Sequence, residues 1–309
     1  MDRREFIAGG VAACALASFA DVAADSEPVA GIKVRFLGTG AAGGANSFRK
    51  CSSVLLDDKV LIDLTSLVLN KIPEGVRPEV IFQTHSHGDH YDPATIVKLG
   101  VKRMYVQETW AAAAKADVAR IAEKLKLPAP EVIALPFGKK IEECGLSFTG
   151  VPANHATSRV TDGVLERASL YLVEKGKTRL LYATDTAGIP ADAARMVGID
   201  AHVNPDNFKG RYAGNPFVHE PQAITALIME ATDGLEDSDF RMFTHSSVQL
   251  VKRTIKGLRQ YDKYCPPEGQ SAYLTHLALR YREWPSEKID AELPTGMKAA
   301  YDGLEIVFR

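Results

Sequence analysis

The sequence His-Ser-His-Gly-Asp-His over residues 85–90 gathers three of the eight histidines of the chain around a carboxylate. Imidazole nitrogens are good ligands for zinc, iron and manganese, and carboxylate oxygens suit the harder of these ions. His85 and His87 can converge on one ion, whereas Asp89 and His90 can reach a second. A polar turn that contains histidines by chance is the plainer alternative, but such a density of ligand types favours a metal site.

A buried strand over residues 80–84 is expected to deliver this cluster, because an apolar run directly precedes it. Two metals need more ligands than the cluster supplies, and these should follow other strands. His155 comes after a strand at 146–151, and Asp185 ends a buried run at 180–184. His276 ends a further strand, at 272–275.

The remaining hydrophobic patterns predict strands and helices that alternate along the chain, as in a layered α/β domain. The expected strands span residues 32–37, 53–56, 60–64, 80–84, 104–107, 132–135, 146–151, 169–173, 180–184, 272–275 and 304–308, and the expected helices span 93–99, 110–127, 221–231 and 248–261. We expect one domain over residues 32–309. The Gly-rich segment 38–44 lacks a GK[ST] motif, so we interpret it as a tight turn near the metals and not as a nucleotide loop.

The N-terminus predicts export. Arg3-Arg4 precede a weakly apolar run at 8–20 and small residues at 22–24, which resembles a twin-arginine signal over residues 1–24, followed by a linker at 25–31. The run is too short to span a bilayer. We therefore expect a periplasmic protein. Lipid anchoring through Cys14 is the alternative that this segment leaves open.

The composition is that of a globular protein, with 46% hydrophobic and 25% charged residues. A formal charge of −2 gives no reason to expect a nucleic acid as partner. A small, anionic substrate is expected instead. The sequence contains no CxxC pair, which is the usual sign of a cysteine zinc site. Cys51, Cys144 and Cys265 could form one disulfide and leave one free thiol, but the sequence does not indicate which two would pair.

These motifs together resemble the metallo-β-lactamase superfamily. The resemblance rests on the HSHGDH segment, the lone His155, the strand that ends in Asp185 and the Leu-Thr-His at 274–276. It extends to the Gly-Thr-Gly turn, to Leu-Ile-Asp at 61–63 and to the closing segment 300–305, which resembles most the cyclic-phosphodiesterase and tRNA 3′-processing-nuclease branches. The resemblance implies a four-layer αββα sandwich of two mixed sheets with the site at one edge.

The resemblance also implies a role for each candidate. His85, His87 and His155 would hold a first ion, whereas Asp89, His90 and His276 would hold a second, with Asp185 as the bridge. Asp89 would also orient the nucleophile, and His219 would protonate the leaving group, unless it only begins a helix. His245 competes with His276 for the last position, and we favour His276 because it leads into the family-like C-terminal segment.

The implied activity is metal-dependent hydrolysis, in which a hydroxide bridging two divalent ions attacks a phosphodiester. Zinc is expected first, and manganese or iron would also suit two carboxylates. A bridging Asp185 argues against β-lactamase activity. A hydrolase of esters, thioesters or lactones and a non-catalytic metal-binding protein are the alternatives, and a nuclease acting on tRNA is disfavoured. Arg159, Lys209 and Arg211 could bind an anionic group or be ordinary surface charges.

Overall fold

A computed structural model describes residues 31–42, 47–215, 217–237, 241–278, 281 and 283–309. The predicted export signal and residues 25–30 of the predicted linker lie outside the described residues. Among the helices of the described part, none is both long and apolar enough to cross a membrane. No disulfide joins the described cysteines Cys51, Cys144 and Cys265, so the disulfide that the sequence allowed does not form among them.

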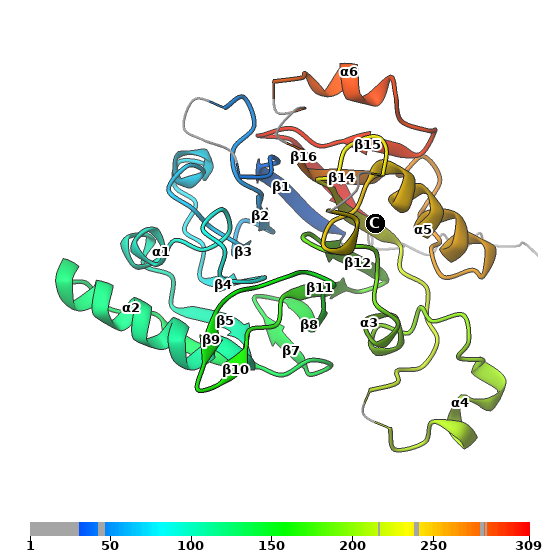
Figure 1. The fold of residues 1–309 in the computed structure, drawn as a ribbon, viewed down its shortest axis with the longest axis horizontal. Coiled ribbons are helices and arrows are strands. Elements are labelled where there is room, and N and C mark those ends of the chain that lie inside the picture. Colours follow the sequence, from blue (N-terminus) through cyan, green and yellow to red (C-terminus); the bar gives the residue numbers. More distant parts are fainter. Residues whose placement is uncertain (1–30, 43–46, 216, 238–240, 279–280, 282) are drawn as a thin grey trace, which may run out of the picture.

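Two seven-stranded sheets form the centre of the molecule (Figure 1). The first contains, in spatial order, β16 (Glu305–Phe308), β1 (Ile32–Gly38), β2 (Ser53–Leu56), β3 (Val60–Ile62), β4 (Val80–Phe82), β5 (Arg103–Gln107) and β6 (Glu131–Leu135). The second contains β15 (Met297–Ala299), β14 (Ala272–Leu277), β13 (Ala226–Ala231), β12 (Thr178–Ala183), β11 (Ser169–Lys175), β8 (Leu146–Pro152) and β7 (Lys140–Glu143).

Both sheets are mixed. In the first, the pairs from β16 to β3 are antiparallel and those from β3 to β6 are parallel. In the second, the pairs from β7 to β12 are antiparallel and those from β12 to β15 are parallel. Because β8, β12, β13 and β14 run in the same direction, their carboxyl ends meet at one edge of the second sheet.

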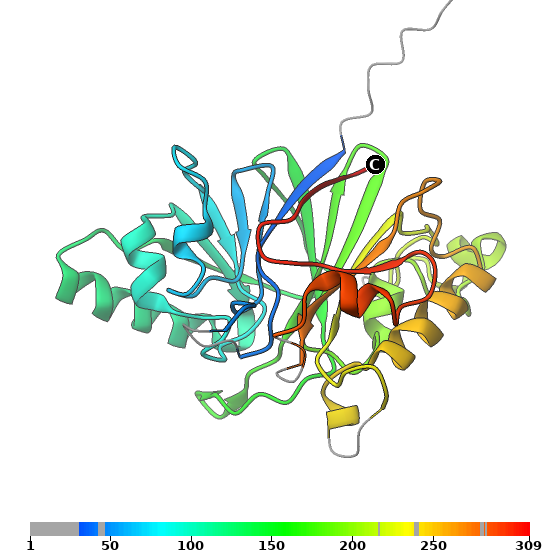
Figure 2. The ribbon, with the colours of Figure 1, turned by 90° about the horizontal axis from the view of Figure 1, so that it is seen from above.

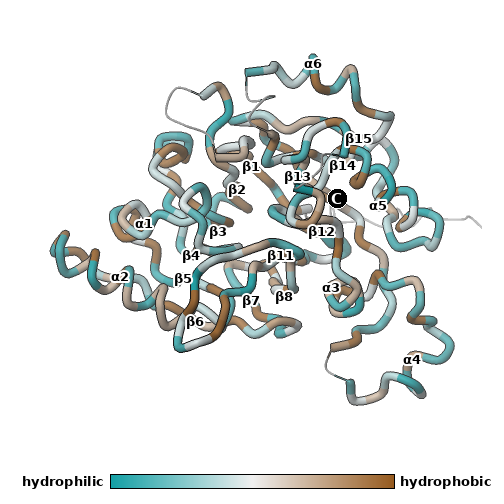
Figure 3. The backbone as a smooth tube through the Cα atoms, in the orientation of Figure 1, coloured by the Kyte–Doolittle hydropathy of each residue, from teal (hydrophilic) through white to brown (hydrophobic). Residues whose placement is uncertain are grey.

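Helices cover the two outer faces of the sheets (Figure 2). The helices of the described part are α1 (Pro93–Leu99), α2 (Ala111–Leu125), α3 (Ala191–Met196), α4 (Pro205–Arg211), α5 (Val248–Gln260) and α6 (Ser286–Asp290), with 3-10 turns η1 (Leu69–Lys71), η2 (Glu108–Trp110) and η3 (Arg241–Phe243). Helix α4 has no buried residues and is not part of this cover. Hydrophobic and hydrophilic residues alternate along α2 (Figure 3), and Ala114, Val118 and Ala122 form its buried face. The described part also holds a small separate hairpin, β9 (Val160–Thr161) with β10 (Val164–Leu165).

Three hydrophobic clusters fill the spaces between these layers. One joins the first sheet to α1 and α2, and another joins the second sheet to α3, α5 and α6. The third lies between the sheets, where the ring of Phe82 stacks on that of Phe148 with centroids 4.0 Å apart. Helix, sheet, sheet and helix therefore form four layers, which confirms the predicted αββα sandwich.

The predicted helix at residues 221–231 is wrong, because the chain there forms strand β13. All six residues of this strand are buried. Ala226 and Ile228 face the core between the sheets, whereas Leu227 and Met229 face the core beneath the helices. A strand in the middle of a sheet is apolar on both faces, so its sequence does not alternate and resembles a buried helix.

Candidate metal centre

The HSHGDH segment forms a compact turn between β4 and α1. The backbone N–H groups of His90 and Tyr91 both donate to the carbonyl of His87, each at 2.9 Å. Asp92 then begins α1 by accepting hydrogen bonds from the backbone of Ala94 and Thr95. Local hydrogen bonds thus fix the path of this segment, which holds several ligand-type side chains at the carboxyl end of β4.

The other predicted ligands lie at strand ends of the second sheet. His155 follows β8, and Asp185 follows β12 in a left-handed conformation with φ of 50°. His276 also has a positive φ of 48° and lies where the register between β13 and β14 shifts. Such a bulge redirects the side chain of the extra residue. The fold thereby brings residues that are distant in the sequence to one edge of the sandwich.

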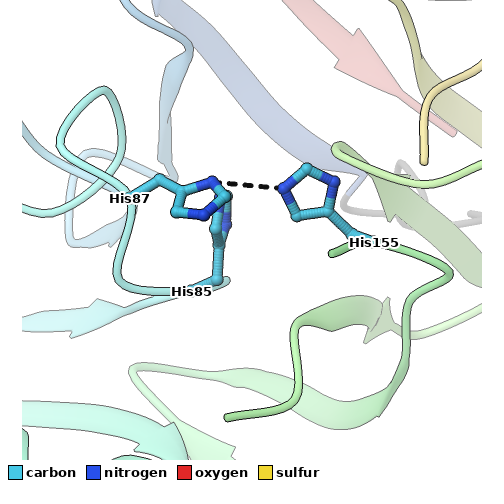
Figure 4. Close-up of side chains that lie close together, drawn as sticks. All are labelled: His85, His87 and His155. Atoms are coloured by element: carbon cyan, nitrogen blue, oxygen red, sulfur yellow. Dashed lines mark hydrogen bonds between the residues drawn. The ribbon is translucent and has the colours of Figure 1, made fainter. Parts of the chain in front are cut away.

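The side chains at this edge form overlapping groups, in each of which the potential ligand atoms lie within 4.8 Å of one another. One group is His85, His87 and His155, and another is Asp89, His90 and His276. Asp185 also groups with His85 and His90 and with His155 and His245, and Glu230 groups with His245 and His276. Figure 4 shows the first group, in which Nδ1 of His87 lies 3.2 Å from Nε2 of His155. Oδ1 of Asp185 lies 3.7 Å from Nε2 of His155, whereas Oδ2 lies 3.0 Å from Nε2 of His90.

Hydrogen bonds at the outer nitrogens determine which ring nitrogens face the centre. Nδ1 of His90 donates to Oδ2 of Asp63 at 2.7 Å, and Nδ1 of His155 donates to the carbonyl of Thr244 at 3.1 Å. Neither a carboxylate nor a carbonyl oxygen can donate, so in both rings Nδ1 carries a proton and Nε2 is the nitrogen directed at the centre.

Two threonines fix the protons of His85 and His276 in the same way. The hydroxyl of Thr84 donates to Asp63, and that of Thr232 donates to the carbonyl of His276. Each hydroxyl oxygen must therefore accept from the adjacent Nδ1, at 3.0 Å from His85 and at 2.6 Å from His276.

Four Nε2 atoms consequently converge on the same small volume. Those of His90 and His276 are only 3.0 Å apart, and Nε2 of His85 is buried without a hydrogen-bond partner. Burial lowers the pKa of His90, but the charges of Asp185, Asp63 and Asp89 outweigh it and raise the pKa well above its ordinary value, so the centre attracts a cation. The donor set therefore fits divalent metal ions.

The carboxylates at the centre have the electrostatics expected of cation ligands. Burial raises the pKa of Asp185, but the surrounding histidines outweigh this and hold the pKa well below its ordinary value. The pKa of Asp89 is lowered in the same way, mainly by His90 and His276 acting against burial. Burial and the neighbouring histidines lower the pKa of His85, which favours its neutral, ligating form.

Asp63 is a functional candidate whose role the sequence did not reveal. It is fully buried and accepts hydrogen bonds from the backbone and the hydroxyl of Thr84 as well as from His90. Burial raises its pKa, and the contacts with His90 and Thr84 oppose that effect. The signals in the sequence are its position at the end of an apolar run and in the Leu-Ile-Asp segment at 61–63, and the structure adds a left-handed conformation with φ of 59°.

His245 and Glu230 form a pair beside the cluster. Nδ1 of His245 lies 3.0 Å from Oε2 of Glu230 and 3.8 Å from Oδ1 of Asp185. Burial lowers the pKa of His245, but the hydrogen bond and charge of Glu230 outweigh it and raise the pKa. Glu230 lies within β13, where the sequence predicts a helix, so the sequence does not indicate its position.

The structure does not bring His219 to the cluster. Its backbone N–H donates to the carbonyl of Arg195, and the charges that act on its ring belong to Arg179, Glu174 and Lys140. Arg179 and Glu174 are paired near the start of β12, whereas Asp185 follows its other end. Burial, then Arg179, lowers the pKa of His219.

The three basic residues considered for binding an anionic group have other partners or positions. Arg159 pairs with Asp117 at 2.9 Å and lies over the rings of Tyr91 and Trp110. Lys209 and Arg211 are exposed on α4, which projects from the body of the molecule (Figure 1). By contrast, the Gly-rich turn does approach the cluster as predicted, because the backbone N–H of Ala42 donates to Oδ2 of Asp89 at 3.1 Å.

A family model described as the beta-lactamase superfamily domain matches residues 65–238, more than half of the chain. The chain therefore belongs to the β-lactamase superfamily, which includes metal-dependent hydrolases. A search of curated proteins finds no significant match.

Several solved structures share the fold. Zn²⁺-bound PqqB from Methylobacterium extorquens is 17% identical, with 89% of this chain and 99% of that chain covered and a TM-score of 0.58. The short form of human tRNase Z is 16% identical, with 90% and 99% covered and a TM-score of 0.60. Unliganded yeast PDE1 is 11% identical, with 91% and 100% covered and a TM-score of 0.54. At these identities the likeness establishes the fold alone.

Proposed function

We propose that this chain is a dinuclear metal-dependent hydrolase of phosphodiester bonds. The observation that carries the proposal is the position of Asp185, whose two oxygens face different groups of ligands. A carboxylate in this position is suited to bridge two cations, and adjacent cations can act on both the attacking and the leaving oxygen of a displacement at phosphorus.

In this proposal the two groups bind one ion each. The ligands are His85, His87 and His155 for the first ion, Asp89, His90 and His276 for the second, and Asp185 for both. When bound, the ions would lower the pKa of a water molecule and polarise the phosphoryl group. We propose zinc because imidazole nitrogens dominate the set, although manganese or iron would tolerate the two carboxylates.

Asp89 and His245 are the proposed proton carriers. The described contacts of Asp89 all involve Oδ2, so Oδ1 can accept the proton of the attacking water. The described hydrogen bonds of the His245 ring all involve Nδ1, so Nε2 can donate to the leaving oxygen. One P–O bond forms as the other breaks, with one proton taken at Asp89 and one supplied by His245.

Alanine variants distinguish the roles of the histidines. His276→Ala should lose one metal, whereas His245→Ala should keep both and lose about 10²–10⁴-fold of its rate on a diester with an alkoxide leaving group. The loss should be smaller for p-nitrophenolate, which departs without a proton. His219→Ala is the control and should resemble the unmodified chain. Loss of a metal from His245→Ala but not from His276→Ala would reverse the two assignments.

Asp185→Ala tests the dinuclear site, with Asp192→Ala as a control at an exposed aspartate of α3. Asp185→Ala should lose at least one metal and most hydrolysis, measured by metal analysis and by turnover of bis-p-nitrophenyl phosphate, a lactone and a β-lactam. Full activity with both metals retained would exclude the bridging role. Turnover of the lactone but not of the phosphodiester would favour the carboxylic ester, thioester or lactone alternative.

The proposal includes a small anionic substrate and an exported protein. Export rests on the arginine pair and apolar run of residues 1–24, which lie outside the described residues. A nucleic acid is not proposed as substrate because the net charge of −2 offers little attraction to a polyanion.

A further inference from the structure

Two loops beside the metal centre expose hydrophobic side chains. The hairpin β9–β10 exposes Val160, Val164 and Leu165, and η3 exposes Met242 and Phe243. Phe243 is 70% exposed, Val160 61% and Leu165 54%. These five residues, called here the apolar collar, are nearly half of the eleven large hydrophobic residues exposed in the described part of the chain. Such clustering marks a binding surface more often than scattered exposure does.

The hairpin is tied directly to the metal-binding turn. The carboxylate of Glu166, which follows β10, accepts from the backbone and the hydroxyl of Ser86 at 2.6 and 2.5 Å. A two-residue turn at Asp162 and Gly163, both with positive φ, closes the hairpin. Because Val160 pairs with Leu165 across the two strands, their side chains share one face, whereas Val164 pairs with Thr161 and lies on the other face of the hairpin.

The second loop is tied to the same centre from the other side. Thr244 follows η3 directly, and its carbonyl accepts the hydrogen bond from Nδ1 of His155. His245 comes next and reaches Glu230. Figure 2 shows the green hairpin and the yellow loop projecting from the same edge of the sandwich, one on each side. Each loop of the collar is therefore hydrogen-bonded to a segment that carries members of the cluster.

Two of the solvent-accessible members of the cluster are neighbours of these loops. His85, His90, Asp185 and His276 are buried, whereas His87, Asp89, His155 and His245 are partly exposed. His87 is adjacent to Ser86, the residue that holds the hairpin, and His245 is adjacent to Thr244. A partner that permanently covered both loops would close this opening. The occupant compatible with turnover is the substrate itself.

We propose that the apolar collar binds a long aliphatic ester group of the substrate, so that the preferred substrates are amphiphilic phosphodiesters. This inference rests on the proposed function. The phosphoryl group lies at the metals while the chain leaves between the hairpin and η3. Full burial of each methylene would raise affinity about 4-fold, and half burial of the five methylenes that distinguish a hexyl from a methyl ester corresponds to about 30-fold.

The test compares metal-loaded wild type with Leu165→Ser, Phe243→Ser and the double variant. Val307→Ser is the matched control, since Val307 is 51% exposed on the edge strand β16. Binding of methyl, hexyl and decyl phosphate is measured by calorimetry below their micellar concentrations. In parallel, kcat/KM is measured for p-nitrophenyl methyl, hexyl and decyl phosphodiesters. Wild type and Val307→Ser should favour hexyl over methyl about 30-fold in both series, and the double variant should lose most of that ratio.

The outcomes separate this inference from the proposed function. If binding depends on chain length but no diester is turned over, the collar binds the alkyl chain and the proposed phosphodiesterase activity is refuted. If methyl and decyl diesters are turned over with equal kcat/KM, the phosphodiesterase activity stands and the proposed role of the collar is overturned. A third measurement is sedimentation with phosphatidylcholine vesicles. If the double variant loses vesicle binding while its hexyl-to-methyl ratio stays at the wild-type value, the collar contacts a membrane surface and the inference is overturned.

Discussion

Asp63 orients two histidines of the candidate metal centre through a short chain of hydrogen bonds. Its Oδ2 accepts from Nδ1 of His90 and from the hydroxyl of Thr84, which in turn accepts from Nδ1 of His85. One buried carboxylate thus fixes the tautomer and the ring direction of both histidines. Such outer contacts commonly determine how well a metal site binds its ion.

Removal of this carboxylate should weaken metal binding. Asp63→Ala is expected to lower metal affinity about 10–100-fold, measured by competition with a chromogenic chelator. Asp63→Asn keeps the volume of the side chain but places an amide NH₂ group against the donors of Thr84 and His90. Its metal affinity should therefore fall by a similar factor. If Asp63→Asn bound metal as tightly as the unmodified chain, the loss in Asp63→Ala would reflect a cavity and not orientation.

Strand ends are the elements that build the centre. Asp63, Asp185 and His276 each adopt a left-handed backbone conformation at or near the end of a strand, and His276 also lies at a bulge. Such conformations are uncommon for residues with a side chain, and surrounding packing must hold them. The buried strands supply that packing, so ligand geometry depends on the rigidity of both sheets.

The hairpin β9–β10 depends on a different kind of support. An isolated two-stranded hairpin is marginally stable in water, and here the buried Glu166 joins it to Ser86. Glu166→Ala should therefore raise the rate of trypsin cleavage after Arg159 and Arg167 about 10-fold, followed by mass spectrometry, because local opening becomes easier. Glu108→Ala, at an exposed site in η2, is the control. An unchanged cleavage rate in Glu166→Ala would mean that other contacts hold the hairpin.

At the scale of the whole molecule, the two sheets are joined at more than their apolar core. Arg103 of β5 donates two hydrogen bonds to Glu143 of β7, at 2.8 and 2.6 Å, and the hydroxyl of Tyr105 donates to the same carboxylate. Burial raises the pKa of Glu143, but these bonds outweigh it and lower the pKa. The folded state therefore binds this proton less readily than the unfolded state does.

This difference predicts a pH-dependent stability. The contribution of ionised Glu143 is fully present above the unfolded pKa of about 4.3 and disappears as the pH falls through the lower folded pKa. Glu143→Gln should reduce the free energy of unfolding by about 1–2 kcal/mol at pH 7. In urea unfolding of both chains, that difference should shrink below about pH 4. A difference that stayed constant from pH 7 to pH 3 would exclude a charged role for Glu143.

The candidate metal centre belongs to the whole molecule, because both sheets contribute residues to it. The 85–90 turn and Asp63 come from the first sheet, whereas His155, Asp185 and His276 come from the second. Neither half assembles the converging nitrogens alone. Ligand binding at this edge is expected to stabilise the contact between the sheets as well as the site.

The sequence by itself determined the types of ligand and the strands that carry them. A dense run of histidines, and acidic or histidine residues directly after apolar runs, are local signals, and the αββα layers followed from them through a family resemblance. Only the tertiary structure decided which distant groups meet. His219 and His245 have similar local surroundings in the sequence, but the position of β13 between β12 and β14 brings Glu230 to His245 and leaves His219 elsewhere. Asp63 likewise acquires its partners through strand pairing, which no spacing in the chain encodes.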